Sequence, residues 1–294
     1  MRLLLTLVAA VVVSACAGSS TGTGGGGGSA GGGTAGGGTG GGGVGGGTGG
    51  GGGGTAGGAG GGTVDAGDPT CSGDGGASKC GCPGFTFCEN FEGATVDTTR
   101  WTLDSDMGTA VIDATKSARG GKSLHVNIKS GAGDRALLTT SKPFPAANNS
   151  FFGRAFVFAK APTPNVHTGI FAAIGGTTEV RLGLDHMGDI EPNYMSATNE
   201  YGVFTSNKSK MPTGVWSCLE WEYRGTGELH FFLNGTEMTQ IEVLATEVPP
   251  WTAPTYSSFS LGMILFQNDS ATATSFDVWF DEVAFNATRV GCAK

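Results

Sequence analysis

The sequence has little positive charge. It contains 17 Lys and Arg against 25 Asp and Glu, which gives a formal net charge of −8, and it has no run of basic residues. A protein that binds nucleic acid through its phosphates needs a basic patch or stripe. The composition therefore argues against nucleic acid as a partner.

Long apolar runs and helical patterns are missing as well. Beyond the first 15 residues, no segment is long and apolar enough to span a bilayer. No amphipathic pattern with helical spacing continues for more than about two turns. We therefore expect few helices, and contact with a membrane only through the N-terminus.

The N-terminus has the composition of an export signal. Arg2 precedes an apolar run that ends in Val13-Ser14-Ala15-Cys16, and a short positive start, an apolar stretch and small residues are typical of secretory signals. The last four residues resemble the lipobox of bacterial lipoproteins. The resemblance implies a signal peptide at 1–15, cleavage before Cys16 and a lipid on that cysteine. An ordinary signal peptide with a chance cysteine is the alternative.

Residues 16–70 are predicted to form a disordered tether. Of the 56 glycines in the chain, 31 lie between Gly18 and Gly62, and such a segment cannot bury enough apolar surface to offset the entropy of ordering it. A Gly-rich coil of this length has a reach of roughly 35–40 Å. In the lipoproteins that the signal resembles, Asp after the cysteine favours the inner membrane. Ala17 therefore favours the outer membrane or the cell surface.

Residues 71–294 are long enough for one all-β domain, which we expect to be monomeric. Without Cys16, six cysteines remain in an exported chain, so disulfides are expected. Fifteen pairings are possible, and a zinc site at Cys80, Cys82 and Cys88 is the alternative, although its spacing is not that of a zinc finger. The six are Cys71, Cys80, Cys82, Cys88, Cys218 and Cys292.

The pattern of this domain is that of β-strands. Residues 123–129 and 218–223 alternate polar and apolar side chains, as half-buried strands do. Asn234-Gly235 is typical of a tight hairpin turn. Many short strands between turn residues predict an antiparallel β-sandwich or jelly roll. The other expected strands are 85–91, 109–114, 136–141, 151–160, 170–174, 179–185, 229–233, 238–244, 257–267 and 275–285.

Several short motifs resemble concanavalin A-like sandwiches, and their order is similar to the core domain of the cellulose-induced proteins and related glucuronan lyases. The resemblance covers roughly residues 85–292 and implies a carbohydrate-handling domain. The motifs are Phe87-Cys88-Glu89-Asn90-Phe91-Glu92-Gly93, the segment 117–124, Gly153-Arg154-Ala155-Phe156, Val166-His167, Val180-Arg181-Leu182-Gly183, Asn193-Tyr194, the segment 216–221 and Trp279-Phe280-Asp281-Glu282-Val283.

The resemblance implies a structural calcium ion. In such sandwiches, acids on the first and last strands and oxygens of a loop hold calcium, a hard cation that prefers oxygen ligands. The matching positions here are Glu92, Ser117, Gly120 and Asp281. The alternative is that the two acids only cap and solvate strand ends.

The resemblance also implies lyase chemistry. A uronate lyase must neutralise the substrate carboxylate, remove the C5 proton and protonate the leaving oxygen. On carry-over, His167 is a base or carboxylate partner, Arg154 and Arg181 are neutralisers, and Tyr194 is a proton donor or base. Asn193 and Gln267 are candidate binding residues. Each of these side chains also has an ordinary structural interpretation, and His125, His186 and His230 are better read as strand or loop residues.

Other activities have weaker support. A retaining β-glucanase on this fold would carry two carboxylates about 5 Å apart in an E-x-D-x-x-E motif, which is absent, although Glu220 and Glu222 share a face. No G-x-S-x-G motif is present. The stronger rival is a carbohydrate-binding module that stacks sugars on tryptophan, with Trp251 as the best exposed candidate. A purely structural surface protein is the third alternative.

Replacing the predicted lipidation site gives a direct test of export and anchoring. We expect Cys16→Ser to move the protein from the membrane fraction to the soluble fraction, with its fold unchanged, because a lipid on Cys16 is the only anchor that the sequence indicates. Fractionation followed by immunodetection measures this. A variant that stays with the membranes would contradict the prediction.

Overall fold

The computed structural model of the chain describes residues 79–195, 199–203, 205–246 and 251–292. These residues form two antiparallel β-sheets with two single-turn 3₁₀ helices, η1 (Ala147–Asn149) and η2 (Thr239–Ile241). The predicted β-sandwich is confirmed. No helix among the described residues is long and apolar enough to cross a membrane. The signal peptide, Cys16, the tether and Cys71 lie outside the described residues.

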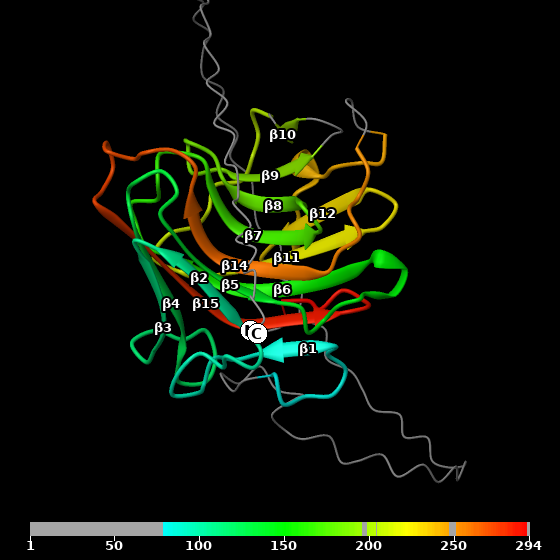
Figure 1. Cartoon of the computed structure of the whole chain (residues 1–294), viewed down its shortest axis with the longest axis horizontal. Coiled ribbons are helices and arrows are strands. Elements are labelled where there is room, and N and C mark those ends of the chain that lie inside the picture. The colour runs from blue at the N-terminus through cyan, green and yellow to red at the C-terminus, as the bar shows by residue number, and fades with distance from the viewer. Residues whose placement is uncertain (1–78, 196–198, 204, 247–250, 293–294) are drawn as a thin grey trace, which may run out of the picture. The chain divides into compact units, whose positions relative to one another are not determined.

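The first sheet has eight strands in the order β13-β12-β11-β6-β15-β4-β3, and β1 pairs with one end of β15 (Figure 1). Their alternating apolar side chains face the second sheet. The strands are β1 (Phe87–Glu89), β3 (Gly108–Asp113), β4 (Ser123–Lys129), β6 (Phe151–Ala159), β11 (Trp216–Arg224), β12 (Glu228–Leu233), β13 (Thr236–Glu237) and β15 (Ser275–Asn286).

The second sheet has seven strands in the order β10-β9-β8-β7-β14-β5-β2 (Figure 1). Its edge strands β2 and β10 and the neighbouring β9 were not expected from the sequence. The strands are β2 (Thr102–Asp106), β5 (Arg135–Thr140), β7 (Thr168–Gly175), β8 (Thr178–Leu184), β9 (Ile190–Met195), β10 (Glu200–Gly202) and β14 (Ser258–Leu265).

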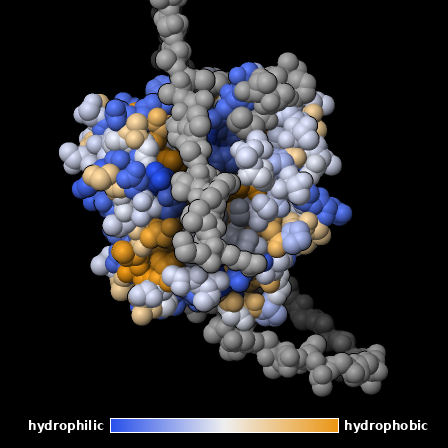
Figure 2. Space-filling model, in the orientation of Figure 1, coloured by the Kyte–Doolittle hydropathy of each residue, from blue (hydrophilic) through white to orange (hydrophobic). Residues whose placement is uncertain are grey.

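The core lies between the sheets and is rich in aromatic rings. Trp221 stacks on Phe259 with ring centroids 4.9 Å apart, and Phe171 lies 4.7 Å from the same indole. Trp221 is 1% exposed. Aromatic pairs of this kind add stability beyond the area that they bury. The visible surface is mostly polar, with smaller apolar areas (Figure 2).

Two local expectations have different outcomes. The turn at Asn234-Gly235 is confirmed, since both residues have positive φ (51° and 86°) and connect β12 to β13. The strand expected at 238–244 is wrong. That segment holds η2, and only a single bridge joins Val243 to Leu229.

Gly153 allows β6 to pass close under Trp221. A Cβ at this position would lie 2.2 Å from indole atoms. We expect Gly153→Ala to lower the free energy of unfolding by about 1–3 kcal/mol, because the indole cannot move in a packed core. Chemical denaturation measures the change. Gly81→Ala is the matched control, because no atom lies within 4 Å of its added Cβ, and equal effects of the two substitutions would contradict the packing argument.

Candidate functional site

The seven-stranded sheet has an outer face made by the side chains that alternate with its core residues. On β8, Val180 and Leu182 belong to the core, so Arg181 and Gly183 point the other way. They lie opposite Asn193 and Glu191 of β9. We call this surface the outer face.

A pocket opens at one end of the outer face, where β8 and β9 are joined. Its volume is about 460 Å³. We call it the His167 pocket, and its lining residues are His167, Asp185, His186, Met187, Asp189, Glu191, Thr205, Ser206 and Lys208.

A buried cation lies between two carboxylates in the His167 pocket. Lys208 is 2.6 Å from Asp185 and also contacts Glu191, and each of the three side chains is at most 6% exposed. Burial disfavours the charge of Lys208, but hydrogen bonds to Asp185 and Glu191 outweigh it and raise its pKa. Burial likewise opposes ionisation of Asp185, yet hydrogen bonds from Lys208 and backbone N–H groups lower its pKa. The Lys208–Asp185 ion pair is therefore charged at neutral pH.

His167 stands at the rim of this pocket, just before β7. Its Nδ1 lies 3.9 Å from Glu191 Oε1, a buried oxygen without a hydrogen-bond partner. The His186 ring is 6.2 Å away, centroid to centroid. The backbone N–H of His167 donates to Gln267 Oε1 over 3.0 Å. A half-exposed imidazole beside a buried carboxylate is an arrangement suited to a general base.

Arg181 is connected to His167 through one aromatic residue. Its guanidinium lies 4.1 Å from the centroid of the Phe266 ring, and the Phe266 N–H donates to the His167 carbonyl oxygen over 3.1 Å. Burial lowers the pKa of Arg181, although Glu179 opposes that shift. The structure therefore brings His167, Arg181, Asn193 and Gln267 to one side of the molecule.

Three other predicted site residues do not reach the outer face. Tyr194 alternates with Asn193 on β9, so it faces the core and packs 5.5 Å from Trp251. Trp251 itself is 7% exposed, and the expectation that it is an exposed sugar platform is wrong. Arg154 belongs to β6 of the other sheet, where it is 3% exposed and pairs with Glu282 over 3.3 Å.

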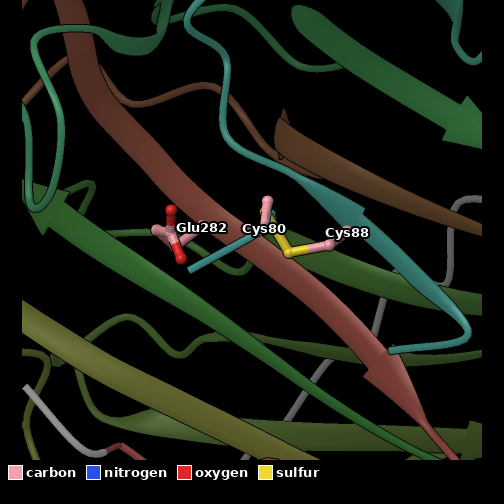
Figure 3. Close-up of side chains that lie close together, drawn as sticks. All are labelled: Cys80, Cys88 and Glu282. Carbon is pink, nitrogen blue, oxygen red and sulfur yellow. A yellow bond between two sulfur atoms is a disulfide. The ribbon is translucent and has the colours of Figure 1, made fainter. Parts of the chain in front are cut away.

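The carboxylate of Glu282 holds Arg154 on the eight-stranded sheet through their ion pair. Glu282 occupies a bulge in β15, with φ of 51°. Its carboxylate accepts hydrogen bonds from the Lys79 N–H over 3.0 and 3.1 Å and pairs with Arg119 over 3.4 Å. Figure 3 shows it beside the disulfide that joins Cys80 and Cys88.

The disulfides and their surroundings exclude two of the alternatives. Cys80 and Cys88 are bonded to each other and Cys82 is also in a disulfide, so these residues do not form the zinc site. Cys218 is bonded to Cys292. Glu220 accepts hydrogen bonds from Arg289 over 2.8 and 3.1 Å and is 1% exposed, so it is not a free hydrolase acid.

The predicted calcium ligands gather around the loop 117–122. Glu92 Oε1 accepts hydrogen bonds from the Gly121 and Lys122 N–H groups, and Asp281 Oδ2 accepts them from Ala118 and Arg119. A Cβ at Gly120 would lie 2.1 Å from Glu92 Oε1, so glycine makes room for that carboxylate. Burial raises the pKa of Asp281 to about 7, against the effect of its backbone hydrogen bonds. These oxygen donors suit a hard cation that would stabilise the ionised carboxylate.

Sequence reasoning missed most of the His167 pocket. Asp185, Glu191 and Lys208 were not singled out, and His186 was read as a loop histidine. Asp185 and His186 follow a strand end in the same short loop, which is a position where polar residues gather. Lys208 is too far from Asp185 and Glu191 in the sequence for a motif of fixed spacing to predict their contact.

The described residues thus form a two-sheet β-sandwich whose outer face carries a polar, histidine-containing pocket. The family model for the Cip1-like core domain, described as polysaccharide lyase-like, matches residues 90–288. This is more than half of the sequence, and the chain belongs to that family.

Two solved structures are similar to the chain. The cellulose induced protein Cip1 has a TM-score of 0.59 and 19% identity, with 70% of this chain and 99% of that chain covered. An endo-β-1,4-glucuronan lyase from the fungus Trichoderma reesei has a TM-score of 0.53 and 12% identity, with 69% and 96% covered. At these identities the likeness shows the fold. A search of curated protein sequences gives no match.

Proposed function

We propose that this domain binds a polysaccharide on the outer face and cleaves it by β-elimination in the His167 pocket. The observation that carries the proposal is the position of His167, half-exposed at the pocket rim and 3.9 Å from the buried, unpartnered Oε1 of Glu191. Membership of a polysaccharide lyase-like family supports the class of ligand.

The two proton transfers of the elimination each have a candidate residue. His167 removes the C5 proton of a uronic acid unit, and Glu191 orients the imidazole and stabilises its protonated form. The C5–H electron pair becomes the C4=C5 double bond as the C4–O bond breaks. His186, across the pocket, supplies the proton to the leaving oxygen. Asn193 and Gln267 lie where they can position the chain.

A non-catalytic binding module is the second candidate. The specific observation in its favour is that Tyr194, the expected proton donor, is buried in the core, 4% exposed. Binding alone requires neither a base nor an acid. The two candidates differ in whether an unsaturated product forms.

We further propose that the domain is exported and lipid-anchored through Cys16 at the outer membrane or cell surface. The lipobox-like sequence at 13–16 and the glycine-rich segment that follows support this. A tether of that length would let the domain reach polymers beyond the membrane surface.

Removing the imidazole of His167 tests the proposed base. We expect His167→Ala to reduce formation of unsaturated product by about 10²- to 10⁴-fold, the usual contribution of a general base. The measurement is the rise in ultraviolet absorbance of the unsaturated sugar during incubation with glucuronan, alginate and related polyuronates, each in its free and its methyl-esterified form. Polysaccharide binding should be largely retained.

His125→Ala is the matched control, because His125 lies on the eight-stranded sheet and contacts Asp277 over 2.8 Å. An unchanged rate in His167→Ala would remove His167 from the chemistry. A wild-type protein that binds polyuronates but yields no unsaturated product from either the free or the esterified form would establish the binding module instead.

We also propose a structural calcium ion held by Glu92, Ser117, Gly120 and Asp281. Ser117 Oγ and the Gly120 carbonyl oxygen are 3.3 Å apart, close to the loop that both carboxylates contact. Calcium bound there would connect β15 to the loop 117–122 and to the segment after β1.

Chelation tests the calcium proposal. We expect a chelator to lower the melting temperature by roughly 5–10 °C, since a ligand at about 100 times its Kd contributes about 2.7 kcal/mol. Differential scanning calorimetry with added calcium should restore the original value, and Glu92→Gln should abolish the response. A melting temperature that does not respond to chelation would rule the ion out.

A further inference from the structure

The outer face holds its cations between pairs of carboxylates. Arg181 lies 3.3 Å from Glu179 and also contacts Glu200 of β10. The side chain is 12% exposed, while the two carboxylates are each more than 40% exposed. A ligand on this part of the face therefore meets the carboxylates more readily than the guanidinium.

The same pattern occurs at the opposite edge of the sheet, beside β2. Arg135 of β5 contacts Asp104 over 2.8 Å and Asp106 over 3.6 Å. Both carboxylates are more than half exposed. Hydrogen bonding to Asp104 raises the pKa of Arg135. The positive charge of Arg135 is therefore already balanced by the carboxylates of Asp104 and Asp106.

Lys208 gives the third case, since Asp185 and Glu191 both contact it in the His167 pocket. The seven strands of the sheet contain no Lys or Arg besides Arg135 and Arg181. Lys208 is the one Lys or Arg among the residues that line the pocket. Outside the described residues, the only Lys and Arg residues in the sequence are Arg2 and Lys294. Among the described residues, each of these three cations thus faces two carboxylates.

This excess of negative charge disfavours a free uronate. A carboxylate on the ligand would have to displace an existing partner or lie beside one, and two like charges 4 Å apart repel by about 1 kcal/mol in water and about 4 kcal/mol at the effective dielectric of a protein surface. A lyase for free uronates needs an available cation at the carboxylate. Among the described residues, Arg135, Arg181 and Lys208 are each matched by two carboxylates. Lys210, which is exposed beside the pocket, is matched by Asp189 over 3.1 Å.

An esterified uronate avoids this repulsion and retains the chemistry. The ester carries no charge, so it needs no counter-cation in the ground state. It also acidifies the C5–H more than a carboxylate does, because removing the proton yields a monoanionic enolate rather than a dianion. A base such as His167 can then act with hydrogen bonds in place of a fixed cation.

We propose that the outer face selects uronate polymers whose carboxyl groups are esterified, an inference that rests on the proposed polysaccharide site. The ester bond itself is untouched. His167 takes the C5 proton, the C5–H pair forms the C4=C5 bond, and the C4–O pair leaves with the oxygen, which His186 protonates. The products are an unsaturated uronate ester and a new hydroxyl-terminated chain end.

The test compares one polymer in two states, a fully methyl-esterified polyuronate and the same preparation after saponification, with the purified full-length chain. We expect the esterified polymer to bind at least about tenfold more tightly, which corresponds to about 1.4 kcal/mol, and to be the better source of unsaturated product. Affinity is measured by isothermal titration calorimetry. Equal or tighter binding of the saponified polymer would overturn the proposal.

A charge-neutralising variant tests whether the carboxylates beside Arg181 cause the preference for the esterified polymer. Glu200→Gln frees Arg181 of one partner, so we expect affinity for the saponified polymer to rise several-fold while affinity for the esterified polymer stays constant. Glu237→Gln, on the eight-stranded sheet and also solvent-exposed, is the matched control and should change neither. A preference that is identical in wild type and Glu200→Gln would contradict the role of these carboxylates.

The two proposals fail in different ways. If no polysaccharide binds in any state, the proposed function itself fails. If only a neutral glucan binds, the domain is a polysaccharide-binding module and the preference for esterified uronates is wrong.

Discussion

The buried carboxylate of Glu282 is the interaction on which much of the eight-stranded sheet depends. An extra residue in β15 turns two successive acids, Asp281 and Glu282, to the same side of the strand. Asp281 then receives N–H groups of the loop 117–122, while Glu282 pairs with Arg119 and Arg154. A buried ion is tolerated only when its partners are in place. The bulge therefore fixes the loop, β6 and the start of the domain relative to one another.

That arrangement leaves the other sheet available for a ligand. The eight-stranded sheet uses its outer side for structural contacts, including the pairing of Glu220 with Arg289 near the Cys218–Cys292 disulfide. The seven-stranded sheet instead presents small residues, such as Gly183 and Ala172, between its charged positions. A Cβ at Gly183 would lie 1.7 Å from the Thr168 carbonyl oxygen. Only glycine therefore fits at this position, because the backbone of β7 lies so close to it.

The sequence predicted the elements whose side chains alternate and missed those that lack this pattern. Residues 123–129 match β4 at both ends, because one face is buried and the other solvated. The edge strand β2 is exposed throughout, so it has no apolar face to reveal it, and β9 carries a proline in its centre. Pairing with neighbours, rather than local preference, makes these segments strands.

For the site, the types of residue were easier to predict than the face of the sheet to which each side chain points. Asn193 and Tyr194 are adjacent, and a strand sends adjacent side chains to opposite faces, so only one of them could line the outer face. Arg154 was assigned to the face on residue type, but its partner Glu282 is 128 positions away. Lys208 was missed for the same reason, since its partners belong to β9 and to the loop after β8. Pairings over such separations are determined by the fold.

The position of Lys79 has a mechanical consequence. Its N–H is bonded to Glu282, and the Cys80–Cys88 disulfide lies beside that carboxylate. A load applied at this point therefore passes through the disulfide to β1 and on to its partner β15, a central strand that is bonded to β4 and β6 on its two sides. The load enters the layer that does not carry the His167 pocket. Such a load thus acts on the eight-stranded sheet before it reaches the sheet that carries the His167 pocket.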